Sequence, residues 1–436
     1  LRDLLKNYLP AGETLPAVPA ALPVIEIPEF HFHKVAPLFS NLPEAKQTVD
    51  IQPMEQFNQG WGTILYRTTL PETTLAGTTL KITEVHDWAQ IYADGKLLAR
   101  LDRRKGEFTT TLPALKKGTQ LDILVEAMGR VNFDKSIHDR KGITEKVELI
   151  SGNQTKELKN WTVYNFPVDY SFIKDKKYSD TKILPTMPAY YKSTFTLDKV
   201  GDTFLDMSTW GKGMVWVNGH AMGRFWEIGP QQTLFMPGCW LKEGENEILV
   251  LDLKGPTRAS IKGLKKPILD VLREKAPETH RKDGEKLKLT GEKVVHEGAF
   301  TPGNGWQEVR FATLVKGRYF CLEALSPQAN DNIAAIAEFD VLGADGKPVS
   351  REHWKIRYAD SEETRSGNRT ADKIFDLQES TFWMTVDNVP YPHQLVIDLS
   401  KVENVTGFRY LPRAEKGYPG MIKEYRVYVK PADFNY

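Results

Sequence analysis

The stretch Trp216-Val-Asn-Gly-His-Ala-Met-Gly-Arg-Phe-Trp-Glu-Ile-Gly-Pro-Gln-Gln-Thr-Leu-Phe-Met-Pro237 decides the fold, because alternating apolar residues enclose a turn of Asn-Gly type. Glycine accepts a positive φ without a Cβ clash, so Asn218-Gly219 predicts a β-hairpin. A polar turn at Gly244 then leads into the apolar run 248–251, which is typical of a core strand. Together these signals predict a β-sandwich module.

The same plan occurs earlier in the chain. Tyr66-Arg67 precedes an Asp94-Gly95 turn by 28 residues, and Tyr191-Lys192 precedes Asn218-Gly219 by 27. Each segment continues with an apolar residue and proline, then a glycine, then an apolar run. These are Leu112-Pro113, Gly118 and 121–125 in the first segment, and Met236-Pro237, Gly244 and 248–251 in the second. Two copies of one β module are the economical explanation.

Length and charge narrow the class of protein. At about 100 to 150 residues per domain, a chain of 436 residues predicts three or four domains. A net charge of +1 and the lack of a basic run with interleaved aromatics argue against a nucleic-acid partner. No apolar run reaches the roughly 20 residues that cross a bilayer, so we expect no membrane span. Cys239 and Cys321 have neither disulfide-framework nor metal-ligand spacing.

Proline, glycine and composition divide the chain into six predicted segments. Residues 1–9 read as the end of a helix that begins upstream, so we expect a carboxy-terminal portion of a larger protein. Five prolines between 10 and 28 predict an extended connector. The segments are 1–44 (helix end and Pro-rich linker), 45–150 (first β module), 151–187 (aromatic-rich bridge), 188–256 (second β module), 257–289 (linker with a short helix at 267–273) and 290–436 (third β module).

The third module follows a plan of its own. Short alternating strands separated by turns are predicted at 337–343, 374–383, 394–399, 405–413 and 422–429. This pattern is typical of an antiparallel sandwich. Because no long amphipathic helix competes with it, we expect the whole chain to be all-β.

These residues resemble a known family. The stretch 216–250, with Val85-His-Asp-Trp-Ala-Gln90 and residues 121–133, resembles the non-catalytic region of family 35 β-galactosidases. Residues 290–436 resemble a discoidin, or factor 5/8 type C, domain through Ser380-Thr-Phe-Trp383 and Gly407-Phe-Arg-Tyr-Leu-Pro-Arg413. The resemblance implies tandem galactose-binding-like jelly-roll β-sandwiches followed by a discoidin-like β-sandwich.

The resemblance also implies that catalysis lies elsewhere. Retaining glycosidases use two carboxyl groups about 5 to 5.5 Å apart, and members of this family carry both glutamates in an amino-terminal (β/α)8 barrel. Residues 1–44 would hold only the end of that barrel and a linker. Glu84, Glu107, Glu126 and Glu227 have no barrel-strand context, so we expect no catalytic residue and no hydrolysis by this chain alone. By resemblance the protein would be periplasmic or extracellular, with its signal segment outside this sequence.

One loop is expected to reach the substrate. In family members the loop matching 129–133 approaches the barrel mouth, which implies that Phe133 and Asn132 contribute to the galactoside pocket. Relatives often carry Tyr at the position of Phe133, and packing at a domain contact is an equally open role for its ring. The neighbouring His138, Asp139 and Arg140 have no Ser or Cys nucleophile beside them. Together with Asn132, and like His86-Asp87, they predict a structural network that holds the loop against the barrel.

Sugar recognition is also expected in the third module, where loop aromatics and charged groups can stack on sugars and hydrogen-bond to them. Tyr391, Arg413 and Tyr418 lie in predicted loops, whereas Trp383 is expected in the core. Many discoidin domains hold a structural calcium ion, and Asp372, Asp376 and Glu379 could supply part of such a site, although no EF-hand-type spacing is present. We predict no other cofactor and no other metal site.

The sequence therefore predicts the accessory region of a β-galactosidase. Its partners would be its own amino-terminal barrel and a β-galactoside or galactose-containing glycan, and it would support the barrel and shape the substrate entrance. The alternative is a stand-alone carbohydrate-binding or adhesion protein without hydrolase activity. The helix end at 1–9 argues against that alternative.

Overall fold

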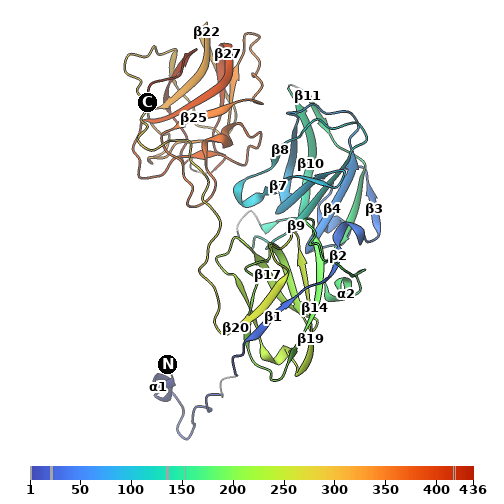
Figure 1. Cartoon of the computed structure of the whole chain (residues 1–436). Helices are drawn as coiled ribbons and strands as arrows, with labels where there is room; N and C mark the ends of the chain where they lie inside the picture. Colours follow the sequence, from blue (N-terminus) through green and yellow to red (C-terminus); the bar gives the residue numbers. More distant parts are fainter. Residues whose placement is uncertain (1, 20–22, 134–136, 153, 416, 418) are drawn as a thin grey trace. The chain divides into compact units, whose positions relative to one another are not determined.

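A computed structural model of the chain describes residues 2–19, 23–133, 137–152, 154–415, 417 and 419–436. The chain divides into two compact units, one made of Leu1–Leu42 and Val168–Glu274, the other of Pro43–Pro167 and Lys275–Tyr436. Strands dominate both units (Figure 1), and the predicted all-β class is confirmed. The α-helices of the described residues are short: α1 (Arg2–Lys6) and α2 (Tyr170–Ile173). Neither of them has the length and apolar character of a membrane span.

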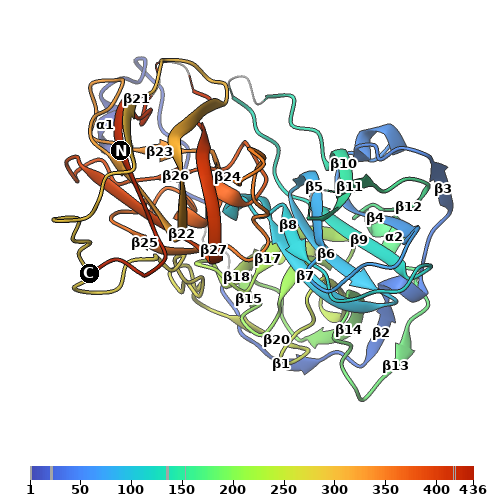
Figure 2. The same ribbon diagram turned by 90° about the horizontal axis from the view of Figure 1, so that it is seen from above.

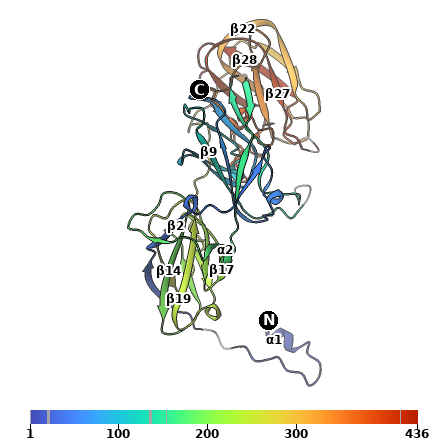
Figure 3. The same cartoon turned by 90° about the vertical axis from the view of Figure 1, so that its right-hand side faces the viewer.

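The first unit is a sandwich of two antiparallel sheets, whose larger sheet is seen in Figure 3. The core between the sheets contains Tyr191, Val250, Leu205 and Met236. In order, the larger sheet is β13 (Ser179–Asp180), β2 (Lys34–Pro37), β14 (Ala189–Leu197), β19 (Gly244–Asp252), β16 (Lys212–Val217) and β17 (His220–Trp226). The smaller sheet is β1 (Ile27–His31), β20 (Ser260–Leu264), β15 (Thr203–Asp206) and β18 (Thr233–Met236).

The helix predicted at 267–273 is wrong. This segment has no regular secondary structure and runs beside residues 228–232. Val271 N–H donates to Pro230 O at 3.0 Å, and Arg273 N–H donates to Ile228 O at 2.7 Å. Its backbone groups are therefore satisfied by a distant segment, and they do not form the local bonds that a helix needs.

The second unit begins with another sandwich. Its core contains Tyr66, Ile123, Leu80 and Val147. In order, the larger sheet is β3 (Ala45–Thr48), β12 (Trp161–Phe166), β4 (Gly62–Thr69), β9 (Gln120–Ala127), β6 (Trp88–Ala93) and β7 (Lys96–Asp102). The smaller sheet is β11 (Gln154–Glu157), β10 (Gly142–Ser151), β5 (Thr79–His86) and β8 (Thr109–Thr111). Strands β11 and β12 of this sandwich come from the predicted bridge 151–187, whose boundaries, like those of the other segments, stay predictions.

The same unit continues with the third module, whose strands β22, β27 and β24 lie together in Figure 2. Its aromatic core includes Phe320, Phe339 and Phe408, and Trp383 is buried in it as predicted, with 1% of its surface exposed. In order, the main sheet is β21 (His296–Ala299), β28 (Glu424–Lys430), β22 (Gln307–Ala324), β27 (His393–Leu411) and β24 (Glu338–Leu342), and β25 (Lys355–Ala359) also pairs with β27. A small sheet joins β23 (Ala335–Ile336) to β26 (Trp383–Met384).

The two glycine turns have the predicted geometry. Asp94 and Gly95 have φ values of 45° and 77°, and Asn218 and Gly219 have 49° and 87°. Two successive residues with positive φ define the type I′ turn, whose twist matches that of the strands on either side. The turns therefore close the hairpins β6–β7 and β16–β17.

Candidate functional site

The loop that follows β9 carries the predicted pocket residues. Phe133 exposes 81% of its surface, and Asn132 is also exposed. Neither side chain therefore belongs to the core of its module. The next residues, 134–136, lie outside the described part of the chain.

A buried ion network holds the base of this loop. The Lys141 ammonium donates to Asp87 Oδ2 at 2.7 Å, to Asp139 Oδ2 at 2.8 Å and to Gly129 O at 2.9 Å. Arg103 Nη1 donates to Asp87 Oδ1 at 2.8 Å and to Asp139 Oδ1 at 2.7 Å. Lys141 is fully buried, so these bonds replace its whole hydration shell. The network joins the loop to the sandwich.

Only part of the predicted network is present. Asp139, Asp87 and His86 belong to it, because His86 Nδ1 lies 3.4 Å from Asp139 Oδ1, whereas Asn132, His138 and Arg140 are exposed. Lys141 and Arg103 were not predicted. The spacing of Lys141 two residues after Asp139 is a weak local signal, but Arg103 lies 36 residues from Asp139 and gives none.

The network sets the ionisation of Asp139. Burial by itself would raise the pKa of this carboxyl, but the hydrogen bonds from Lys141 and Arg103 lower the pKa to about 2. Asp139 is therefore an anion at neutral pH. It acts as a fixed charge in the loop and does not supply a proton.

A second group of predicted residues lies where the loops of the third module meet. The guanidinium of Arg413 lies 4.5 Å from the ring centroid of Phe382, and that of Arg369 lies 4.3 Å from the same centroid. Tyr391 donates its hydroxyl to Ile333 O at 2.6 Å and is half-buried. Tyr418 lies outside the described residues. We call Arg369, Phe382 and Arg413 the loop-end cluster.

The loop-end cluster carries positive charge on an aromatic ring. Arg413 forms an ion pair with Glu415, whereas no carboxylate among the described residues pairs with the Arg369 guanidinium. Burial and the neighbouring Arg413 charge lower the pKa of Arg369. The cluster offers a planar donor group and an apolar ring, which are the elements that orient a sugar. Arg369 and Phe382 were not predicted, because no periodicity marks them in their loops.

The residues predicted to hold calcium have other partners. Asp376 accepts hydrogen bonds from the Thr381 hydroxyl at 2.8 Å and from Gln378 N–H at 3.0 Å. The Lys373 ammonium lies 3.9 Å from Asp372, and Glu379 accepts a bond from Trp306 Nε1 at 3.4 Å. Among the described residues, no group of three or more His, Cys, Asp or Glu is arranged to hold a metal ion. The calcium ion stays a prediction.

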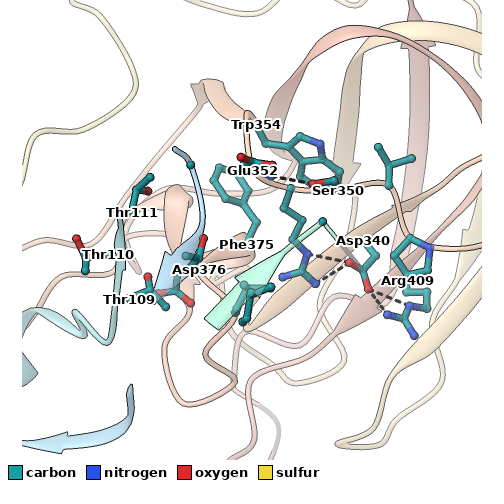
Figure 4. Close-up of a pocket in the computed structure, with 18 residues that line it drawn as sticks. Thr109, Thr110, Thr111, Asp340, Ser350, Glu352, Trp354, Phe375, Asp376 and Arg409 are labelled. Atoms are coloured by element: carbon teal, nitrogen blue, oxygen red, sulfur yellow. Dashed lines mark hydrogen bonds and ion pairs between the residues drawn. The ribbon is translucent and has the colours of Figure 1, made fainter. Parts of the chain in front are cut away.

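A cavity of about 460 Å³ lies between β8 and the third module, within the second unit (Figure 4). Thr109, Thr110 and Thr111 line it from β8, and Trp354 and Phe375 line it from the third module. The two aromatic rings pack edge to face, with centroids 5.9 Å apart. We call this space the junction cavity.

Ion pairs balance the charges in the wall of the junction cavity. Asp340 Oδ1 accepts from Arg351 Nε at 2.8 Å, and Asp340 Oδ2 accepts from Arg409 Nε at 3.0 Å (Figure 4). Arg351 also pairs with Glu338. Burial raises the pKa of Glu338 to about 8, although Arg351 opposes this. Both guanidinium groups of the wall therefore have carboxyl partners within the protein.

Two features of the junction cavity are unusual. Trp354 is 6% exposed, and its buried Nε1–H has no hydrogen-bond partner. An unpaired buried donor costs about 1–3 kcal/mol. Leu377, which also lines the cavity, has a φ of 65°, a conformation that costs a residue with a Cβ about 1–2 kcal/mol. Such local costs gather at binding sites more often than elsewhere.

Comparison with protein families matches three segments of the chain. Residues 52–167 match the family model described as the first all-beta domain of beta-galactosidase, and residues 188–246 match its galactose-binding domain. Residues 358–436 match the F5/8 type C domain.

Curated relatives include proteins of animals and bacteria. Human beta-galactosidase-1-like protein 2 is 34% identical over 205 residues, which are 45% of this chain and 30% of the relative. A beta-galactosidase of Xanthomonas manihotis is 33% identical over 237 residues, 54% of this chain and 38% of the relative. A beta-galactosidase of Bos taurus is 32% identical over 327 residues, 64% of this chain and 46% of the relative. The chain thus spans less than half the length of these relatives.

Proposed function

We propose that the chain is the accessory region of a β-galactosidase, because it carries two β-galactosidase domains and an F5/8 type C domain. The observation that carries this proposal is the occurrence of all three domains in one chain, together with its β-galactosidase relatives. The parent protein hydrolyses terminal β-galactosides with retention, using two glutamates of a barrel outside this sequence. It acts in the periplasm or outside the cell.

The contacts of the chain's own glutamates support a non-catalytic role. Glu84 accepts hydrogen bonds from His86 Nε2 at 3.0 Å and from the Ser380 hydroxyl at 3.1 Å. Glu227 pairs with Lys254. Glu107 Oε2 accepts the backbone N–H of Asp102 at 3.1 Å. Each of these three carboxylates is thus engaged by its own unit, whereas retaining hydrolysis needs two carboxylates that face one sugar.

The loop after β9 shapes the substrate entrance in this proposal. The ion network of Lys141 fixes the base of the loop, and Phe133 presents its ring to solvent. Covering an exposed aromatic ring with a sugar or with a barrel wall lowers the free energy of the complex. Phe133 and Asn132 would line the galactoside pocket when the barrel is present.

The loop-end cluster binds a galactose-containing glycan in this proposal. Arg413 and Arg369 donate to sugar hydroxyls, and the exposed part of Phe382 contacts the apolar face of the ring. Tyr391 supports the neighbouring loop through its bond to Ile333 O. Tyr418 keeps the sugar-contacting role that the sequence predicts for it.

A binding experiment tests the glycan role. The purified chain is titrated with lactose in a calorimeter, and Arg413→Ala is compared with Arg310→Ala, an exposed arginine of β22. We expect Arg413→Ala to weaken binding at the loop-end cluster at least tenfold and Arg310→Ala to leave it unchanged. Equal affinities in both variants would sink this part of the proposal.

The second candidate function is a stand-alone carbohydrate-binding or adhesion protein, which the F5/8 type C match also allows. Determining the coding sequence upstream of Leu1 separates the two functions. The accessory role requires a barrel with two strand-end glutamates upstream. A start codon directly before Leu1 would favour the adhesion protein.

A further inference from the structure

We propose that the junction cavity is a second carbohydrate site, which takes an uncharged mono- or disaccharide. The site is separate from the loop-end cluster, whose Arg369, Phe382 and Arg413 do not line the cavity. It goes beyond the accessory role and depends on it only for the choice of probe sugars.

Size and composition suit a small sugar. The volume of about 460 Å³ lies within the range of about 300–1,000 Å³ that is typical of small-molecule sites. Trp354 and Phe375 supply apolar surface, which suits the C–H groups of a pyranose. Thr109 and Thr111 bring two hydroxyls to the opposite wall, whereas Thr110, which pairs with the core residue Leu80, faces the other side of β8. Each hydroxyl can donate and accept, as sugar hydroxyls do.

The unpaired donor of Trp354 points to a ligand with acceptors. Its indole N–H is buried and lacks a partner, whereas the indole N–H groups of Trp210 and Trp383 bond to backbone oxygens at 2.9 Å and 3.0 Å. Buried indole N–H groups normally find a partner. A sugar hydroxyl oxygen in the cavity would be that partner.

The balance of charge selects an uncharged ligand. Asp340 binds both Arg351 and Arg409 through four hydrogen bonds and ion pairs, and Arg351 also pairs with Glu338. A carboxylate or sulfate on the sugar would find no unpaired guanidinium here. A neutral sugar needs none.

A neighbouring cavity of about 570 Å³ gives room for a second residue of a disaccharide. The two cavities share Ile150, Arg351 and Leu377 in their walls. In the second cavity, Oε1 of Glu338 and Oε1 of Gln378 are buried without a hydrogen-bond partner, although both residues line it. These unpaired acceptors suit the hydroxyl donors of a sugar.

Two substitutions test the junction cavity from its two walls. Trp354→Phe removes the indole N–H but keeps an aromatic ring, and because that N–H has no protein partner its loss leaves no new unpaired group. Thr111→Trp fills the cavity from β8, where Thr111 is exposed. Thr194→Trp, at an exposed position of β14 in the other unit, is the control for adding a large ring. Thermal unfolding shows whether each variant is folded.

The full chain is titrated with lactose and with methyl β-galactoside by calorimetry. We expect two binding events, one of which weakens at least tenfold in Trp354→Phe and in Thr111→Trp but persists in Thr194→Trp and in Arg413→Ala. If folded Trp354→Phe and Thr111→Trp both keep the wild-type stoichiometry and affinities, the junction site is refuted. In that case a loss confined to Arg413→Ala would leave the proposed function standing. If the cavity variants lose only one binding event and Arg413→Ala changes neither event, the result would support the junction site and contradict the loop-end role.

Discussion

The two six-stranded sheets, one in each unit, are built alike. Their second, third and fourth strands and their terminal hairpins follow one order, β12-β4-β9-β6-β7 in one and β2-β14-β19-β16-β17 in the other. Their turns share the same hydrogen bonds. Asp94 N–H donates to Gln120 O at 2.9 Å and its carboxylate accepts Gln120 N–H at 2.9 Å, while Asn218 and Glu247 repeat both bonds at 3.0 Å.

The copies differ at the end of the strand that pairs with the hairpin, which is β19 in the first unit and β9 in the second. After β19, the Asp252 carboxylate accepts the backbone N–H groups of Gly211 and Lys254, both at 2.7 Å, and the chain turns at once. After β9, a buried Lys141 with two carboxylate partners holds a longer loop that includes exposed Phe133. A tight turn therefore closes this end of the scaffold in the first unit. In the second unit the same end carries the loop with Phe133, and we call it the presenting end. Function in such repeats is best sought where the copies diverge.

The largest expected effect on the free energy of unfolding comes from replacing Lys141, the centre of the ion network at the presenting end. Lys141→Met leaves Asp87 and Asp139 buried with Arg103 as their remaining cation, so we expect a loss of about 3–5 kcal/mol in the free energy of unfolding. Urea denaturation measures it. The control Lys146→Met removes a half-exposed partner of Glu148 and should cost less than about 1 kcal/mol. Equal losses in the two variants would show that the network does not hold the loop.

Acid should weaken the presenting end through Asp139. Its pKa in the folded state, about 2, lies below the usual value of 3.8, so the ionised form favours folding. The stabilisation, about 2 kcal/mol, is present above pH 4 and is lost as the pH falls towards 2. Asp139→Asn should therefore destabilise the chain at pH 5 but much less at pH 2.5, by urea denaturation. A pH-independent difference would contradict this assignment.

The equivalent residues Arg67 and Lys192 should differ in the strength of their ion pairs, because their acidic partners stand at different positions of the two copies. Arg67 binds Asp122 through two hydrogen bonds of 2.7 Å and 3.0 Å, and Asp122 is buried. Lys192 pairs with Glu247 at 2.5 Å, and both side chains are about a quarter exposed. We expect Arg67→Met to cost about 2 kcal/mol and Lys192→Met less than about 1 kcal/mol. Thermal unfolding that ranks them in the reverse order would overturn the comparison.

The smallest effect on stability is expected at Phe133. Because its ring is 81% exposed, Phe133→Ala should change the free energy of unfolding by no more than about 0.5 kcal/mol. In a longer protein that includes the barrel, the same substitution should raise KM for a β-galactoside. An unchanged KM there would remove Phe133 from the pocket.

The sequence predicted those parts of the fold that depend on neighbouring residues. Asn218-Gly219 and Asp94-Gly95 indicate hairpins by themselves, because a type I′ turn needs two residues that accept positive φ. The short helix at 267–273 was predicted wrongly, because backbone bonds to 228–232 override a weak local preference. Local patterns carry no information about such distant partners.

The site was harder to predict for the same reason. Asp139 was predicted in a network that holds the loop against the barrel, whereas its observed partners are Lys141 and Arg103 of its own sandwich, and Arg103 lies 36 residues away. The junction cavity lies between Thr111 and Trp354, which belong to different modules, so no spacing in the sequence indicates it. Arg413 was predicted from its loop, whereas its neighbour Arg369 was not.

The most direct test of the account is hydrolysis of a chromogenic β-galactoside by two purified proteins, this chain alone and a longer protein that includes the upstream sequence. We predict that the longer protein hydrolyses the substrate and that residues 1–436 alone do so no faster than buffer. Hydrolysis by residues 1–436 at a rate comparable to that of the longer protein would contradict the claim that this chain is an accessory region.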